Sequence, residues 1–320
     1  MKHALPAVAL LLISASPVLS QQAWKQGRTP DGQPDIEGIW TSYTITPFER
    51  PARWAGKTTL SAVEVKAYEE ERAKAAAQPP RRANDVGGDT WSDPGTKMLY
   101  GGQTSMVIDP PDGKVPVKPE AEAHRQFMLQ HSADSWEYMS VWDRCLTRGV
   151  PGGMFPGNND NGYQIYQTPG YVVVFYENIH EAHIIPLDLA PDGKSPHRLP
   201  DNVRQLNGDS HGRWDGNTLI VETTNYDGIT QIATSAIQGR LRAMPMSPKT
   251  HVIEKFTRIN EKVLNYEVTI DDPETYSRPW TARIPLNGEP GYRLFEVACH
   301  EGNTATEMTL KGARIQEQGK

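Results

Sequence analysis

Alternation of apolar and polar residues dominates the second half of the chain and restricts what it can fold into. In "VLNYEVTI" (263–270), every second residue is apolar: Leu264, Tyr266, Val268 and Ile270. A repeat of two residues is typical of a β-strand with one face on a core. From residue 163 onward, strand-length segments follow one another between turn signals: "YQIYQT", "YVVVFYE", "AHIIPLD", "TLIVETTNY", "HVIEKFTRI", "VLNYEVTI", "TARIPL" and "YRLFEVACHE".

Consecutive strands without intervening helices favour an antiparallel meander. A meander of about eight strands commonly closes into a barrel, because closure removes the unpaired edges. The sequence therefore predicts a mainly β fold with a few peripheral helices and a lipocalin-like closed barrel. A β-sandwich is the alternative, since periodicity does not separate the two.

The first half of the chain has a different character. The segment "LSAVEVKAYEEERAKAAA" (60–77) predicts a helix, with Ser61 and Glu64 at capping-box spacing. Residues 105–130 predict a strand, a tight turn and a helix that begins near Pro119, whereas residues 78–96 predict a long loop. We expect a signal peptide at 1–20, an irregular and helical segment at 21–150, the barrel at 151–316 and a tail at 317–320.

The first residues indicate an exported protein. Lys2 and His3 precede an apolar run at 4–14 that is too short to span a bilayer, and a small-residue cleavage pattern precedes Gln21. No later stretch is apolar enough for a membrane span, so we expect a periplasmic or secreted protein. The net charge of −6 lacks the basic footprint of a nucleic-acid binder.

Export also gives a role to the two cysteines, Cys145 and Cys299. An oxidising compartment favours a disulfide between them. Closing so long a loop stabilises a fold by roughly 5 kcal/mol in the chain-entropy model. A free catalytic thiol is the alternative.

Several phrases together are similar to a known group of proteins. They are "SMVIDPPDGKVPVKPEA", "RCLTRGVP", "YQIYQTPGYVVVFYENIHEAHIIPLD", "GDSHGRWDGNTLIVETTNY", "SRPWTARIPL" and "FEVACHEGN". In this order they resemble a large group of exported bacterial proteins of unknown function, over about residues 30 to 314. The resemblance implies export, and it carries no activity and no catalytic residue over to this chain.

The stretch "GDSHGRWDGN" (208–217) holds the first candidates for chemistry. His211 lies two residues after Asp209 and four before Asp215, so either carboxylate could orient its ring as a general base. "WDGN" is also a good hairpin turn, which would explain Asp215. Trp214 is a candidate for substrate binding, with a plug at one end of the barrel as the alternative.

A second candidate pair is the H-x-x-H of His180 and His183. Their flanks are β-type, and rings at i and i+3 of a strand point to opposite faces. We expect the pair to straddle a hairpin turn, with His180 toward a barrel mouth as a catalytic candidate. His183 then begins the next strand in a structural role.

The segment "CHEGN" provides the remaining polar candidates. A disulfide at Cys299 would hold His300 and Glu301 beside Arg144, where they could act in catalysis and substrate binding. A cap over the barrel is the alternative. Tyr163 and Tyr166 could line a pocket for a flat or sugar-like ligand, although sheet packing explains most aromatic residues of this half.

No cofactor is identified from the sequence. Asp209, His211 and Asp215 would suit a divalent metal, but they fall short of a full ligand set without His180 or His300, so a metal is not favoured. The chain lacks the motifs G-x-S-x-G, H-E-x-x-H, G-x-x-x-x-G-K-[ST], G-x-G-x-x-G and C-x-x-C-H, and with them the commonest hydrolase, zinc-protease, nucleotide and haem sites.

Two functional hypotheses follow. In the first, the barrel holds a pocket for a small organic substrate, aromatic or sugar-like, and acts as a lyase or hydrolase through His211 and Asp209. In the second, the same barrel is a binding protein that captures a hydrophobic or aromatic ligand without converting it. Convergence of His180, His211 and His300 in one pocket would favour the enzyme.

Overall fold

The structure is a computed structural model that describes residues 24–77, 95–188, 198–232 and 241–319. The predicted signal peptide and most of the loop predicted at 78–96 lie outside these residues. The strands are β1 (Gly38–Thr41), β2 (Val107–Asp109), β3 (Gly162–Thr168), β4 (Tyr171–Tyr176), β5 (Glu181–Pro186), β6 (Asp209–Asp215), β7 (Thr218–Thr224), β8 (His251–Asn260), β9 (Val263–Asp271) and β10 (Trp280–Gly288). The α-helices are α1 (Ala62–Ala76), α2 (Pro119–Gln130) and α3 (Ala305–Gln318), and short 3-10 helices occur at Ala52–Trp54, Trp136–Tyr138 and Gly152–Met154.

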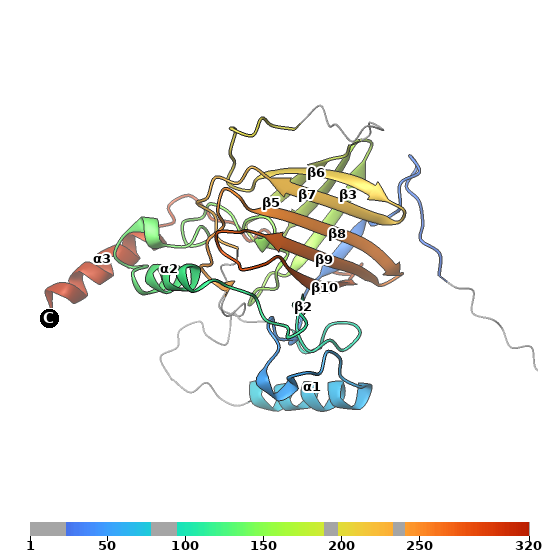
Figure 1. Cartoon of the computed structure of the whole chain (residues 1–320), viewed down its shortest axis with the longest axis horizontal. Helices are drawn as coiled ribbons and strands as arrows, with labels where there is room; N and C mark the ends of the chain where they lie inside the picture. Colours follow the sequence, from blue (N-terminus) through green and yellow to red (C-terminus); the bar gives the residue numbers. More distant parts are fainter. Residues whose placement is uncertain (1–23, 78–94, 189–197, 233–240, 320) are drawn as a thin grey trace, which may run out of the picture.

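Nine of these strands form an antiparallel sheet in the order β5-β4-β3-β1-β10-β9-β8-β7-β6, and β2 adds to β10. The sheet curls until its two ends meet (Figure 1). There, Leu187 and Gly212 form an isolated parallel bridge, and the Asp188 N–H donates to the Gly212 carbonyl at 2.7 Å. The predicted antiparallel barrel is confirmed, in a form that is nearly closed.

The interior of the barrel is packed with side chains. Along β9 the buried residues alternate, as predicted for 263–270. The largest fully buried side chains of the strands belong to one core cluster: Trp40, Tyr163, Ile165, Ile185, Leu219, Phe256, Tyr266 and Trp280. The largest aromatic side chains of the described strands are therefore buried in this core.

The predicted helices form for the expected local reasons. Ser61 and Glu64 make the predicted capping box at the start of α1, and Pro119 occupies the first turn of α2. Figure 1 shows α1 set apart from the barrel. No helix among the described residues has both the length and the apolar character needed to cross a membrane.

Three elements differ from the expectations. Residues 292–301 form no strand beyond a single bridge between Asn178 and Val297, because β1 pairs with β10 and occupies the sheet position beside it. Residues 209–215 form β6, and only Gly216 and Asn217 make the hairpin turn. Helix α3 was not expected; its Arg314 donates to the Asp134 carbonyl just after α2, at 3.0 Å.

Candidate functional site

The closing seam of the barrel contains a polar cavity. The strand ladders join β5 only to β4 and β6 only to β7, so the two edge strands meet at the Leu187–Gly212 bridge without forming a regular ladder. A cavity of about 300 Å³ lies between β5 and the start of β6. Its polar lining consists of Tyr176, Glu181, His183, Gln205, Asn207, Asp209 and Ser210.

His183 and Ser210 connect the two edge strands across this cavity. Both are buried, and the alternation of the strands turns both toward the barrel interior. Nε2 of His183 lies 2.8 Å from Oγ of Ser210, which is also 2.8 Å from Oγ1 of Thr223. On the other side of the imidazole, Nδ1 lies 3.3 Å from the Tyr176 hydroxyl.

Burial determines the charge of this imidazole. It lowers the pKa of His183 to about 4, because the charged form would lose its hydration. The ring is therefore neutral at neutral pH and carries one proton. With that proton on Nδ1, the ring donates to Tyr176 and accepts the Ser210 hydroxyl proton at Nε2.

Two carboxylates give the cavity a negative character. Glu181 accepts hydrogen bonds from the Thr147 hydroxyl at 2.6 Å and from the Asn207 amide at 2.7 Å. Asp209 accepts one from the Leu199 N–H at 2.9 Å. No lysine or arginine is among the lining residues. The site therefore favours neutral or positively charged groups over anions.

The structure brings the predicted pair Asp209 and His211 into contact. Asp209 lines the cavity, whereas His211, the predicted general base, does not. Nε2 of His211 lies 3.1 Å from Oδ2 of Asp209, and its Nδ1 lies 3.6 Å from the Asp188 carboxylate. The His211 side chain is 0 % exposed and does not line the cavity. Asp209 is thus the member of this pair that lines the cavity.

The other predicted histidines lie elsewhere. His180 occupies the turn between β4 and β5 with a φ of 57°, as expected for a hairpin, and packs edge-on against Phe175. His300 is exposed, and its Nδ1 lies 2.8 Å from the Glu301 carbonyl oxygen. Within the described residues, no hydrogen bond or ion pair joins any two of His180, His211 and His300.

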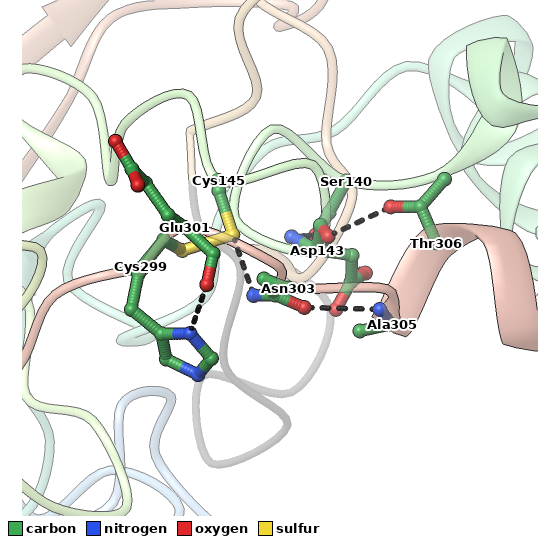
Figure 2. Close-up of a disulfide and its surroundings, with 9 residues drawn as sticks. Ser140, Asp143, Cys145, Cys299, Glu301, Asn303, Ala305 and Thr306 are labelled. Carbon is green, nitrogen blue, oxygen red and sulfur yellow. Dashed lines mark hydrogen bonds between the residues drawn. A yellow bond between two sulfur atoms is a disulfide. The ribbon is translucent and has the colours of Figure 1, made fainter.

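The predicted disulfide between Cys145 and Cys299 is confirmed (Figure 2). Neither cysteine is free, so the alternative of a catalytic thiol is wrong. The bridge does not bring Arg144 to the seam cavity, because its guanidinium lies 5.6 Å from the centre of the Trp136 ring. Arg144 instead lines a separate cavity of about 250 Å³ with His124 and Tyr138.

The predicted aromatic contacts are also dispersed. Tyr163 is buried in the core, where its hydroxyl lies 2.8 Å from that of Ser42, and Tyr166 is exposed on the outer face of β3. Trp214 lies near the opposite end of β6 and packs against the core. Over the residues that the structure describes, no three His, Cys, Asp or Glu side chains are arranged to hold a metal ion.

A buried carboxyl group lies on an inward-facing position of β8. Oε1 of Glu254 accepts a hydrogen bond from the Tyr266 hydroxyl at 2.9 Å, and Oε2 has no hydrogen-bond partner among the described residues. Burial raises the pKa of Glu254 to about 7. Charge on Glu254 in turn contributes to the raised pKa of Tyr176, after burial itself.

Sequence reasoning missed Ser210 and assigned His183 only a structural role. The alternation in "AHIIPLD" does place His183 on the face of Ile185, and therefore inside. Its partner Ser210 is 27 residues away, so the signal for their contact lies in barrel closure rather than in any local spacing.

Protein-family models, characterised proteins and solved structures were compared with this chain, and none matches. The resemblance to exported bacterial proteins therefore stays a prediction. The functional assignment rests on the geometry of the seam.

Proposed function

We propose that the chain binds a small hydrogen-bonding molecule of sugar size, neutral or positively charged, in the cavity between β5 and β6. The observation that carries this proposal is the polar lining, which includes Glu181 and Asp209 and no lysine or arginine. The volume of about 300 Å³ lies at the lower end of the roughly 300–1,000 Å³ typical of small-molecule sites.

The lining suggests how such a ligand is held. Hydroxyl or ammonium groups of the ligand donate to the carboxylates of Glu181 and Asp209, where charge-assisted hydrogen bonds are strongest. Ile184 and Pro186 supply apolar surface at the wall formed by β5. A carboxylate or phosphate on the ligand would face both acidic side chains, and this repulsion selects against anions.

We further propose that the protein is exported and works in the periplasm or outside the cell. The Cys145–Cys299 disulfide supports this location, since disulfides persist in oxidising compartments. The basic and apolar pattern of the first 20 residues is the second support.

As a second proposal, the chain is a lyase or hydrolase in which Asp209, rather than His211, is the general base. The 3.1 Å contact between Asp209 and His211 at the cavity wall favours it. Asp209 would then be the general base that faces the substrate, and His211 would orient it. An Asp209→Asn variant that binds ligand but converts none would support this role, and one with full turnover would contradict it.

Binding is tested by thermal shift with three sugars of matched size: glucose, glucosamine and glucuronate. We expect glucose and glucosamine to raise the melting temperature and glucuronate to leave it unchanged. Ile184→Trp, which fills the cavity from an exposed position of β5, should abolish both shifts. Ile259→Trp, the same change at an exposed position of β8, should preserve them. No shift with any sugar, or equal shifts in both variants, would contradict the proposal.

A further inference from the structure

We infer that the seam cavity is an esterase site in which Ser210 is the nucleophile and His183 its general base. This inference rests on the proposed function, because the substrate must enter the cavity proposed to bind sugar-sized molecules. The substrate class is a small acyl ester of a hydroxylated compound. None of the residues predicted from the sequence supplies this nucleophile.

The first support is the contact between the two side chains. Both line the cavity, and their 2.8 Å separation is that of an activated nucleophile and its base. The Ser210 hydroxyl has one proton and two acceptor lone pairs. If the Thr223 hydroxyl donates to Ser210 at 2.8 Å, the Ser210 proton is left for the imidazole.

The second support is the group behind the imidazole. The Tyr176 hydroxyl lies 3.3 Å from Nδ1 of His183. In the tautomer with the proton on Nδ1, this hydroxyl accepts that proton and holds the ring with Nε2 toward Ser210. This is the order of nucleophile, base and orienting group that acyl transfer requires. Glu181 and Asp209 line the same cavity.

The third support comes from the unpaired strand edges. The Gly212 carbonyl accepts across the seam from Asp188, and N–H groups of a strand point to the same side at every second residue. The N–H of Ser210 on β6 and that of Ile184 on β5 therefore point into the seam. Within the described structure neither has a backbone partner there, so both are placed to donate to the substrate carbonyl oxygen.

The reaction balances with water as the second substrate. Oγ of Ser210 attacks the ester carbonyl carbon and gives its proton to Nε2 of His183. The bond from carbon to the alcohol oxygen breaks, and His183 returns the proton to that oxygen. Water then attacks the acyl group on Ser210, loses a proton to Nε2 and releases the acid, after which the hydroxyl of Ser210 recovers its proton.

The test uses diisopropyl fluorophosphate, a neutral probe from which a serine oxygen displaces fluoride. We expect one phosphoryl group per chain, located at Ser210 by peptide mass spectrometry. Ser210→Ala should take up none, and Ser277→Ala, at a serine outside the cavity, should react as the natural chain does. His183→Gln should slow labelling at least 100-fold, and added imidazole should restore part of the rate.

Hydrolysis of 4-nitrophenyl acetate gives an independent readout on the natural chain. Its rate should fall only below about pH 4, because burial keeps the pKa of His183 near that value and protonation of the ring stops the reaction.

Labelling at other residues, or equal rates for the natural chain and a folded His183→Gln variant, would overturn the inference. Should either variant fail to fold, absence of labelling at Ser210 in the natural chain overturns it alone. Sugar-induced thermal shifts without labelling would refute the esterase and leave the binding proposal intact.

Discussion

Nε2 of His183 lies 2.8 Å from Oγ of Ser210, and this hydrogen bond joins the two edge strands of the barrel beside their isolated backbone bridge. The contact places a neutral imidazole between a hydroxyl group and a tyrosine inside the wall of the seam. It therefore links the stability of barrel closure to the protonation of one side chain.

The first prediction concerns acid stability. The pKa of His183 is about 4 in the folded chain against an ordinary value of 6.5, so the unfolded chain takes up a proton first as the pH falls. This group should lower the free energy of unfolding between pH 6.5 and 4, by roughly 3 kcal/mol in total, and have no further effect below pH 4. In urea denaturation, the change of the unfolding free energy with pH should differ between the natural chain and His183→Gln across this range only. His251→Gln, at a partly exposed histidine of β8, is the control.

Glu254 should act in the opposite direction. Its pKa is about 7 in the folded chain against an ordinary 4.5, so as the pH rises the unfolded chain releases its proton first. Stability should fall between pH 4.5 and 7, by roughly 3 kcal/mol, and stay constant above pH 7. Glu254→Gln should remove this dependence, while Glu261→Gln in the exposed turn after β8 should keep it. A pH profile unchanged by Glu254→Gln would mean that the buried carboxyl does not titrate in this range.

These two groups offset each other in the natural chain. Between pH 4.5 and 6.5, His183 and Glu254 change the unfolding free energy with pH by similar amounts and in opposite directions. The natural chain should therefore show little pH dependence from this pair, and each single variant should reveal the contribution of the other residue.

The disulfide supports a segment that has few other attachments. Apart from the disulfide at Cys299, residues 290–303 are held mainly through Glu177. Its carboxylate accepts hydrogen bonds from the Tyr292 hydroxyl and the Phe295 N–H. The double variant Cys145→Ser/Cys299→Ser should have a free energy of unfolding that is lower by roughly 2–5 kcal/mol. Its circular dichroism before unfolding should keep the β signal of the natural chain. Equal stability of the oxidised and reduced natural chain would show that the bridge contributes nothing.

Asp209 is expected to select cations. Asp209→Asn should weaken binding of glucosamine by about tenfold and that of glucose by less, because it removes the charge but keeps a hydrogen-bonding group. Asp215→Asn, at the hairpin end of the same strand, should leave both affinities unchanged. Isothermal titration calorimetry measures both, and an equal loss for the two sugars would argue against an electrostatic role of Asp209.

Local patterns were sufficient to predict much of the barrel. Alternation identified most strands, and the capping box located α1. Strand β6 was missed because Asp209, Ser210, His211 and Gly212 are poor strand formers that pairing with β7 nevertheless holds extended. The strand expected at 292–301 was wrong because the neighbouring position beside β10 belongs to β1, which is more than 200 residues earlier in the chain.

The candidate site was less accessible to such reasoning. Asp209 and His211 are close in sequence, and their contact was foreseen. Which of them faces a cavity depends on the face of β6, and that face is set by the register with β7. The pair of His183 and Ser210 exists only because the first and last strands of the sheet meet.

The central claim is that the seam between β5 and β6 binds a small neutral or cationic molecule. Amide NMR shifts during titration with glucosamine, with glucuronate as the matched anion, test it most directly. We expect glucosamine to shift the resonances of Ile184, Asn207 and Ser210 in a saturable manner, and glucuronate to shift none of them. Saturable shifts confined to the cavity beside Arg144, or no saturable shift with glucosamine, would contradict the account.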